Sequence, residues 1–268
     1  MKDNKIVASI IFAAGKGSRM KGYDGNKTLL PLVPGGNHFE GGRPILLRII
    51  NNLPPGPKAL VVNYKKEEII RATKDFNLTY CEQPELNGTG GAILSALNFI
   101  KHKEYDYLLV TMGDTPLVEK STFFSLTREL KNRHLAVLGF RPKDKKKYGV
   151  LDVENGKVKK IIEWEYWSKY TEDERKRFSI CNAGIYAFRK EALLKYMDLL
   201  GRNPHKVVKE RSGKKVTIDE YFITDIIQWM HEDGLEIGCY TAENEYEVMG
   251  VDDVDSLITA QRIYREGG

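Results

Sequence analysis

The stretch Lys5-Ile-Val-Ala-Ser-Ile-Ile-Phe-Ala-Ala-Gly-Lys-Gly-Ser-Arg-Met20 joins an apolar run to a glycine-rich turn. We predict a buried strand over residues 5–13. Glycines let backbone N–H groups approach a ligand, and successive N–H groups form an anion site. Lys16 and Arg19 add positive charge, and Arg can hold a phosphate through two parallel hydrogen bonds. The turn is therefore expected to bind a nucleotide phosphate through Ala13, Ala14, Gly15 and Gly17.

Two better-known phosphate motifs are excluded by spacing. The P-loop pattern GxxxxGK[ST] is absent, and Met20 occupies the place of the third glycine in the dinucleotide pattern GxGxxG. A nucleotide-binding dehydrogenase is therefore disfavoured. For this segment alone, an ordinary turn between a strand and a helix remains an alternative.

The first half of the chain alternates short apolar runs with amphipathic stretches. This order predicts a mostly parallel sheet with helices on both faces, a Rossmann-like α/β fold. The expected strands cover residues 59–63, 78–81, 107–111 and 135–140. The expected helices cover residues 65–74, 91–101 and 121–131. We expect one domain over residues 1–268, with a nucleotide-binding half at 1–140.

The second half, residues 141–268, changes pattern. Glu154-Asn-Gly156 predicts a hairpin between strands at 149–153 and 158–163. A further strand is expected at 179–188, and helices at 191–200, 222–232 and 253–265. The lysine-rich segments 142–147 and 206–215 are expected to be solvated loops, with a place beside substrate phosphates as the alternative. Aromatic residues at 164–170 are expected to pack a helix or an interface rather than stack on a sugar.

Composition narrows the class of protein. The 268 residues are 41% hydrophobic with a net charge of +5, which supports a folded core and gives no reason to expect nucleic-acid binding. Three cysteines without CxxC spacing argue for a reducing compartment, and we expect the cytoplasm. No apolar run is long enough to cross a bilayer, and the start of the chain is interpreted as a strand rather than a signal peptide.

A second glycine-rich segment, Gln83-Pro-Glu-Leu-Asn-Gly88-Thr89-Gly90-Gly91-Ala92, follows a predicted strand and opens a predicted helix. N–H groups at a helix N-terminus can meet an acceptor, and a Gln amide can recognise both donor and acceptor edges of a base. On its own, the segment could equally be a capped helix.

One carboxylate is a candidate ligand for Mg²⁺. Asp114 lies just past the carboxyl end of a predicted strand, where ligands bind in open α/β sheets, and Mg²⁺ prefers carboxylate and phosphate oxygens. The alternative for Asp114 is a structural Asp bonded to backbone. Asp252 and Asp253 both precede the last predicted helix, so a cap for that helix is the interpretation of Asp252 from the residues alone.

Together with Lys27-Thr-Leu-Leu-Pro31, the first turn resembles the signature AAGxGxRM followed by a lysine, found in the sugar-phosphate nucleotidyltransferases (sugar-nucleotide pyrophosphorylases). Within this superfamily, the sequence resembles in particular the uridylyltransferase domain of the bifunctional N-acetylglucosamine-1-phosphate enzyme. The resemblance spans residues 5–265 and implies a GT-A-like fold. Hexapeptide repeats of a left-handed β-helix are absent.

The resemblance also implies roles for individual residues. Arg19 and Lys27 would contact the triphosphate and the developing charge. Gln83 and Gly88 would meet a pyrimidine base, with Thr89 beside them. The metal ligands would be Asp114 and Asp252, although the most similar relatives have Asn at the second position. The sugar would be bound by Gly149, Glu163 and Asn182, which makes residues 141–268 the sugar-binding half with the C-terminal helix.

The implied reaction joins a nucleoside triphosphate, UTP favoured, to a sugar 1-phosphate, N-acetylhexosamine 1-phosphate favoured, with Mg²⁺ and release of pyrophosphate. Alternatives are a glucose-1-phosphate uridylyl- or thymidylyltransferase and a catalytically idle regulator that binds sugar nucleotides. Two departures from the family pattern stand near Lys27: Asn26 replaces a proline, and the loop 33–42 is several residues longer than usual. The sequence does not fix the oligomeric state.

Overall fold

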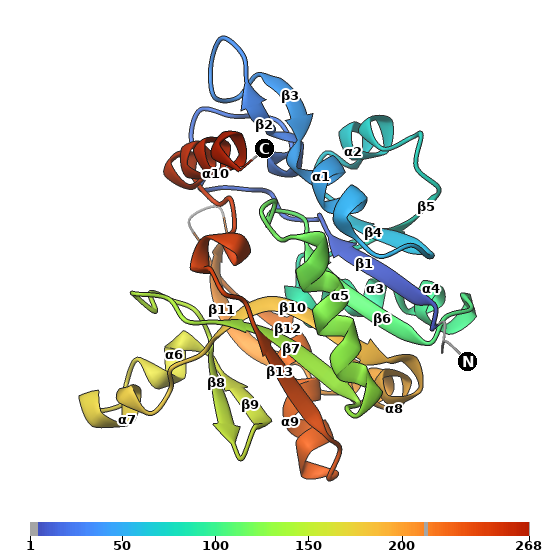
Figure 1. The fold of residues 1–268 in the computed structure, drawn as a ribbon, viewed down its shortest axis with the longest axis vertical. Helices are drawn as coiled ribbons and strands as arrows, with labels where there is room; N and C mark the ends of the chain where they lie inside the picture. Colours follow the sequence, from blue (N-terminus) through green and yellow to red (C-terminus); the bar gives the residue numbers. More distant parts are fainter. Residues whose placement is uncertain (1–4, 212–213, 268) are drawn as a thin grey trace.

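The structure of the chain is a computed structural model that describes residues 5–211 and 214–267 (Figure 1). Its strands are β1 (Val7–Phe12), β2 (Pro31–Pro34), β3 (Gly41–Pro44), β4 (Lys58–Val62), β5 (Leu78–Glu82), β6 (Tyr107–Met112), β7 (Leu135–Phe140), β8 (Val150–Glu154), β9 (Lys157–Ile162), β10 (Cys181–Arg189), β11 (His205–Arg211), β12 (Lys214–Glu220) and β13 (Ile237–Thr241).

The α-helices are α1 (Ile45–Asn52), α2 (Lys66–Ala72), α3 (Gly88–Ser95), α4 (Leu97–His102), α5 (Lys120–Arg128), α6 (Trp164–Trp167), α7 (Glu172–Lys176), α8 (Lys190–Arg202), α9 (Ile223–Glu232) and α10 (Val254–Glu266). Short 3-10 helices are η1 (Lys27–Leu29), η2 (Glu129–Lys131) and η3 (Glu245–Val248).

Strands from both halves of the chain form one mixed sheet. Its order is β13-β7-β10-β6-β1-β4-β5, and the β8–β9 hairpin joins it through β10. The central strand β1 runs parallel to β4 and β6, whereas β10 runs antiparallel to β6 and β7. The predicted mostly parallel α/β sheet is confirmed.

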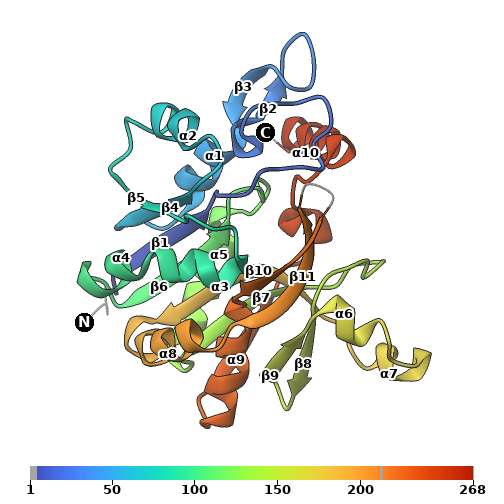
Figure 2. The ribbon, with the colours of Figure 1, turned by 180° about the vertical axis from the view of Figure 1, so that it is seen from behind.

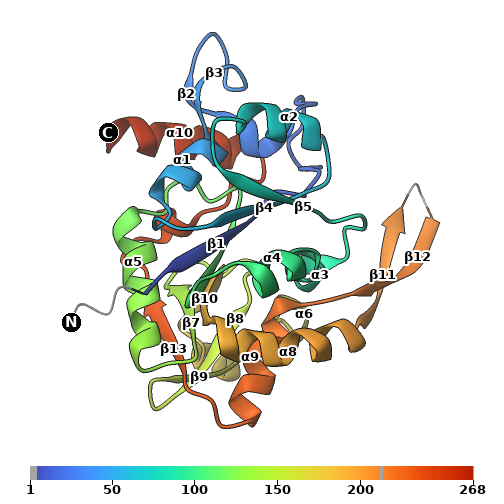
Figure 3. The same cartoon turned by 90° about the vertical axis from the view of Figure 1, so that its right-hand side faces the viewer.

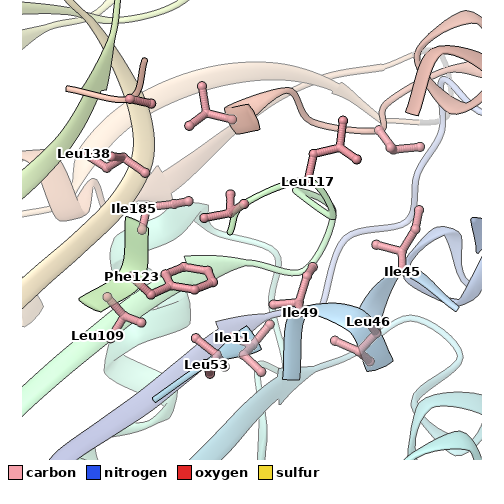
Figure 4. Packing of buried hydrophobic residues seen from close by; sticks show 14 of the residues in the cluster. Ile11, Ile45, Leu46, Ile49, Leu53, Leu109, Leu117, Phe123, Leu138 and Ile185 are labelled. Carbon is pink, nitrogen blue, oxygen red and sulfur yellow. The ribbon is translucent and has the colours of Figure 1, made fainter. Parts of the chain in front are cut away.

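Helices cover both faces of this sheet because alternate residues of each buried strand point to opposite sides. In β1, Ile11 belongs to a core built with α1, α5 and α10, and Figure 4 shows Ile11 beside Ile49 and Phe123. Ile10 belongs to the other core, built with α3, α4, α8 and α9. The reverse view in Figure 2 shows α3, α4, α8 and α9 on that second face.

The predicted elements occur where the periodicity placed them, with ends shifted by a few residues. Asn155 and Gly156 have φ values of 50° and 75°, as a tight hairpin turn requires. Two details were wrong. The helix expected at 91–101 is two helices, α3 and α4, and the segment 206–215 is not a loop.

The lysine-rich segment 206–215, apart from residues 212 and 213, which lie outside the described residues, is paired in the antiparallel β11–β12 hairpin. Figure 3 shows the hairpin projecting from the body of the protein. Valine and isoleucine lie among charged residues here, and Val207 lies opposite Ile218. Ion pairs such as Lys209 Nζ to Glu220 Oε1 at 2.7 Å offset the lysine charge. The other segment, 142–147, is a loop as predicted.

The long loop 33–42 folds as the β2–β3 hairpin against α10. The Gln261 amide of α10 is 1% exposed, and its Nε2 donates to the carbonyl oxygens of Pro31 and His38 at 2.8 Å. Phe39 stacks on Tyr23, with ring centres 5.5 Å apart. The loop therefore ties the segment after the glycine-rich turn to the last helix.

All three cysteines are free, as expected. Among the described helices, none combines the length and apolar character that crossing a membrane requires.

Candidate active site

The site lies at the edge of the sheet where β1 and β6 end. The glycine-rich turn follows β1, and Gly113-Asp114 follows β6. The N–H of Gly113 donates to the carbonyl of Phe12 at 2.9 Å, so the two loops lie side by side. Gly17 has a φ of 62°, and a Cβ there would lie 3.0 Å from the Lys27 side chain. Glycine thus lets the turn approach that lysine closely.

Lys27 is positioned by a short capped turn. Asn26, the residue that replaces the family's proline, is fully buried, and its Oδ1 accepts a hydrogen bond from the Thr28 N–H at 3.0 Å. Its Nδ2 donates to the Tyr64 carbonyl at 2.8 Å. Sequence reasoning treated Asn26 only as a departure from the pattern. Asn as an N-cap residue is the signal that could have identified its role.

The Lys27 ammonium lies between the two predicted carboxylates. Its Nζ is 2.5 Å from Asp114 Oδ2 and 2.9 Å from Asp252 Oδ1, and its side chain is 11% exposed. Burial lowers the pKa of Lys27, but the two carboxylates outweigh burial and the pKa is raised. Lys27 therefore keeps its charge at neutral pH.

Arg19 reaches the same centre from the glycine-rich turn. Its guanidinium nitrogen is 2.8 Å from Asp252 Oδ1, and its side chain is 71% exposed. Because the contact is solvent-exposed, it holds the guanidinium only loosely. Arg19 is thus free to turn toward an incoming phosphate.

Asp252 is not the cap of the last helix. Asp253 takes that role: its Oδ1 accepts from the Ser256 N–H at 2.9 Å, within a capping box at the start of α10. Asp252 instead faces Lys27 and Arg19. The N–H of Val251 donates to the Asp114 carbonyl at 2.8 Å, which holds the two carboxylate segments together.

The carboxylates fit a hard divalent cation such as Mg²⁺. Lys27 uses one oxygen of each carboxylate, Asp114 Oδ2 and Asp252 Oδ1. The other two oxygens lie on a common side, because a Cβ on Gly250 would be 3.7 Å from Asp252 Oδ2 and 3.9 Å from Asp114 Oδ1. Among the described residues, no three or more His, Cys, Asp or Glu side chains lie close enough together to hold a metal ion by themselves. Two carboxylates that leave room for phosphate oxygens suit Mg²⁺.

The base end of the site lies beyond β5. Gln83 is 4% exposed, and its Nε2 donates to the Gly88 carbonyl at 3.2 Å. Gly88 has a φ of 92°, and a Cβ there would lie 2.4 Å from the Tyr221 carbonyl oxygen. The Thr89 hydroxyl accepts from the Ile223 N–H at 3.3 Å, so this side chain also supports the start of α9.

The three predicted sugar residues come together at the opposite end. The N–H of Asn182 donates to the Gly149 carbonyl at 2.8 Å. A Cβ on Gly149 would lie 2.9 Å from Ile161 Cγ2 and 3.1 Å from Glu163 Oε2, so glycine lets the backbone approach that carboxylate closely. Burial raises the pKa of Glu163, and the Thr224 hydroxyl, which donates to Oε1 at 3.3 Å, opposes the shift. Sequence reasoning assigned Thr224 only to the start of a helix.

Part of the aromatic cluster after Glu163 packs against the protein, as predicted, whereas Tyr166 is exposed. Trp167 is buried in α6, and its indole N–H donates to the Tyr148 carbonyl at 2.9 Å. The Lys147 ammonium lies 4.8 Å from the ring centre of Trp164. These contacts support the backbone on both sides of Gly149 and Glu163.

The groups follow the strand order along one edge of the sheet. Gln83 follows β5, the glycine-rich turn and Asp114 follow β1 and β6, and Asn182 begins β10. From β5 to β10, this edge therefore presents an amide for a base, paired charges for phosphates, and an amide with a carboxylate for hydroxyl groups.

Residues 9–193 match the MobA-like NTP transferase domain. The chain belongs to this family. Among curated proteins, this NTP transferase domain is 29% identical over 269 aligned residues to the bifunctional protein GlmU of Buchnera aphidicola, and 31% identical over 268 to that of Brucella canis. The alignments cover 98% of the chain but 54% and 53% of those proteins, so the chain spans about half their length.

Two solved structures share the fold of the NTP transferase domain. One, from Bacillus anthracis, is described as a glucose-1-phosphate thymidylyltransferase in complex with sucrose, with a TM-score of 0.70, 20% identity, and coverage of 97% of this chain and 96% of that one. The other is the uridine diphosphate N-acetylglucosamine pyrophosphorylase of Trypanosoma brucei with an inhibitor, with a TM-score of 0.73, 12% identity, and coverage of 96% and 64%.

Proposed function

We propose that the chain transfers a nucleotidyl group from a nucleoside triphosphate, UTP favoured, to a sugar 1-phosphate, N-acetylhexosamine 1-phosphate favoured. The observation that carries the proposal is the Lys27 ammonium held by Asp114 and Asp252, between an amide-lined base end and a sugar end. GlmU relatives that match nearly the whole chain support the same reaction class.

The reaction is an in-line displacement. An oxygen of the sugar phosphate forms a bond to the α-phosphorus, the bond from that phosphorus to the bridging oxygen breaks, and pyrophosphate leaves with the electron pair. A phosphate oxygen is already nucleophilic, so no protein base has to remove a proton. Positioning and charge neutralisation then account for catalysis. Lys27 and Arg19 would neutralise the triphosphate.

Asp114 and Asp252 would hold Mg²⁺ through the oxygens that face Gly250. A bound Mg²⁺ would supply additional positive charge to the phosphates. Lys27 would orient the two carboxylates from their other side, through its 2.5 Å and 2.9 Å contacts.

The sugar end would select its substrate through directional hydrogen bonds. Glu163 would accept from a sugar hydroxyl, because a carboxylate accepts but does not donate when ionised. Asn182 uses Oδ1 to accept from the Gly184 N–H at 2.9 Å and one amide proton for the Tyr186 hydroxyl at 2.8 Å. Its second amide proton remains for a sugar or acetamido oxygen.

The test is pyrophosphate release with Mg²⁺, using the four common triphosphates against a panel of sugar 1-phosphates. Release with UTP and N-acetylglucosamine 1-phosphate, and none without the sugar phosphate, is the expected result. Preference for glucose 1-phosphate with UTP or dTTP would replace the substrate assignment. No release with any pair, together with a raised melting temperature in a sugar nucleotide, would replace catalysis by a regulatory binding role.

A further inference from the structure

The buried amide of Gln83 has both of its protons committed inside the protein. Its Nε2 donates to the Gly88 carbonyl at 3.2 Å and to Asn87 Oδ1 at 3.1 Å. A backbone carbonyl can only accept, so the amide nitrogen, not its oxygen, must face Gly88. Two acceptors use the two N–H bonds of the amide. What Gln83 has left for a ligand is therefore an acceptor, Oε1.

Asn87 is itself held in place by the fold. Its carbonyl accepts from the Tyr221 N–H and its own N–H donates to the Glu85 carbonyl, both at 2.9 Å. Its side chain lies over Gly91, where a Cβ would be 1.7 Å from Asn87 Oδ1. Only glycine at 91 leaves the space that this oxygen occupies.

From this geometry we propose that Asn87 is a positioning residue that, together with the Gly88 carbonyl, fixes Gln83 as a hydrogen-bond acceptor, and that the base end thereby selects uracil or thymine over cytosine. The inference rests on the proposed function, because it takes the site of Gln83 to be the base site. It adds a residue and a cause to the expected preference for UTP.

The chemistry of the bases gives the discrimination its direction. The ring N3 of uracil and thymine carries a proton and can donate to Gln83 Oε1. The N3 of cytosine has a lone pair instead, so two acceptors would face each other without a proton between them. A buried polar group left unpaired is costly, which is why sites built on hydrogen bonds discriminate strongly.

Without an acceptor at position 87, the Gln83 amide has one internal partner instead of two. The amide can then turn to offer a proton to cytosine, at the cost of its bond to Gly88. We therefore expect Asn87→Leu to lower the ratio of kcat/KM for UTP to that for CTP about tenfold or more. The change should appear mainly in KM, because the base is remote from the reacting phosphorus.

Asn87→Asp is the conservative variant, since it keeps an oxygen acceptor at the same place and should retain the UTP preference. Gly91→Ala reaches the same contact from the other side, because its methyl group would displace Asn87 Oδ1, and it should lower the ratio as Asn87→Leu does. Asn77→Leu makes the same change at an exposed, remote position and is the matched control.

The Kd of UTP and of CTP, measured without any sugar phosphate, separates this proposal from the proposed reaction. If the wild type turns over no pair of substrates, the reaction fails, yet a wild-type preference for UTP that falls in Asn87→Leu still supports the role of Asn87. An unchanged ratio in folded Asn87→Leu or Gly91→Ala, or an equal loss in Asn87→Asp, would overturn it. Tighter binding of GTP than UTP would overturn the assignment to pyrimidines, because guanine also donates from a ring N–H.

Discussion

Lys27 combines burial with a charge that two carboxylates keep in place. Removing one of the two carboxylates should affect the binding of phosphate groups more than the stability of the fold, because the ammonium retains the other carboxylate as a partner. Substitutions at these residues can therefore separate catalysis from stability.

Asp114→Asn keeps the shape of the side chain and removes its charge. On the proposed function we expect turnover to fall about 100-fold or more, the scale seen when a charge-stabilising group is lost. Pyrophosphate release measures the loss, and circular dichroism checks that the variant folds. Turnover near that of the wild type in the folded variant would remove Asp114 from the catalytic site.

Gly250→Ala tests the proposed cation site, because it adds a methyl group beside the two free carboxylate oxygens. The added methyl group would make only ordinary contacts, at 3.7 Å and 3.9 Å from the free carboxylate oxygens, so the fold should persist. It would, however, occupy space that Mg²⁺ and its waters need. We expect the Mg²⁺ concentration for half-maximal activity to rise about tenfold. An unchanged Mg²⁺ requirement would place the metal elsewhere.

Glu163→Gln should weaken the binding of the sugar phosphate and stabilise the folded protein, and the gain in stability should depend on pH. Burial raises the pKa of Glu163 in the folded state, so folding favours the protonated form and this group costs stability as the pH rises through the folded pKa. The variant should therefore resist denaturant better than the wild type at pH 7. The difference should vanish below about pH 4, where the carboxyl is protonated in both states.

The same variant should raise the KM for the sugar phosphate about tenfold, because a charged acceptor is replaced by a neutral amide. Urea unfolding at the two pH values and steady-state kinetics measure the two effects. Equal stability of variant and wild type at pH 7, with unchanged KM, would show that Glu163 is neither strained nor in contact with substrate.

At the scale of elements, the β2–β3 hairpin and α10 act as one unit joined by Gln261. Gln261→Leu would leave the carbonyls of Pro31 and His38 without their donor. We expect the free energy of unfolding to fall by about 2 kcal/mol, the usual cost of buried groups left unpaired. Chemical denaturation measures it, with exposed Gln228 changed to Leu as the control. If Gln261→Leu and Gln228→Leu lowered the free energy of unfolding equally, the hydrogen bonds of Gln261 would not stabilise the packing of the hairpin on α10.

Local patterns predicted most elements because buried strands and amphipathic helices have their own periods. β7 has the bounds that its apolar run indicated, and Asp253 caps α10 as an Asp before a helix should. The β11–β12 hairpin was missed because its few apolar residues, such as Val207 and Val208, lie among lysines, and the charged run was interpreted as a solvated loop. The Ser-Gly dipeptide at 212–213, which is typical of a turn, was not used.

Predicting the site required more than local pattern. Arg19, Lys27, Asp114 and Asp252 were named through a family resemblance, and the structure brings their side chains together. The role of Thr224 depends on a contact between segments far apart in the sequence, which no single stretch encodes, whereas Asn87 meets Gln83 from four positions away and was missed because side-chain direction is not written in the local pattern. Thr224, for example, meets Glu163 from 61 positions away.

At the scale of the molecule, one sheet carries the base end and the sugar end at separate strands. Binding of the two substrates should therefore be separable by mutation. A ligand at 100 times its Kd stabilises a protein by about 2.7 kcal/mol, so UTP and the sugar phosphate should each raise the melting temperature. We expect Gln83→Ala to reduce the shift from UTP and to leave the shift from the sugar phosphate unchanged, and Glu163→Gln to reduce the shift from the sugar phosphate and to leave the shift from UTP unchanged. Loss of both shifts in either variant would indicate that one substrate must bind before the other.

The hydrogen bond from the Val251 N–H to the Asp114 carbonyl joins an early segment of the chain to a late one, so the site is completed only near the end of synthesis. A ribosome makes Lys27 and Asp114 early, but Asp252 follows only after strand β13. Chain growth thus supplies the base end first, the sugar end next, and the second carboxylate last. A nascent chain interrupted before residue 252 lacks Asp252 and all of α10, whose Leu257 and Ala260 belong to the core. On the proposed function, activity is therefore expected only after translation has passed both the second carboxylate and the last helix.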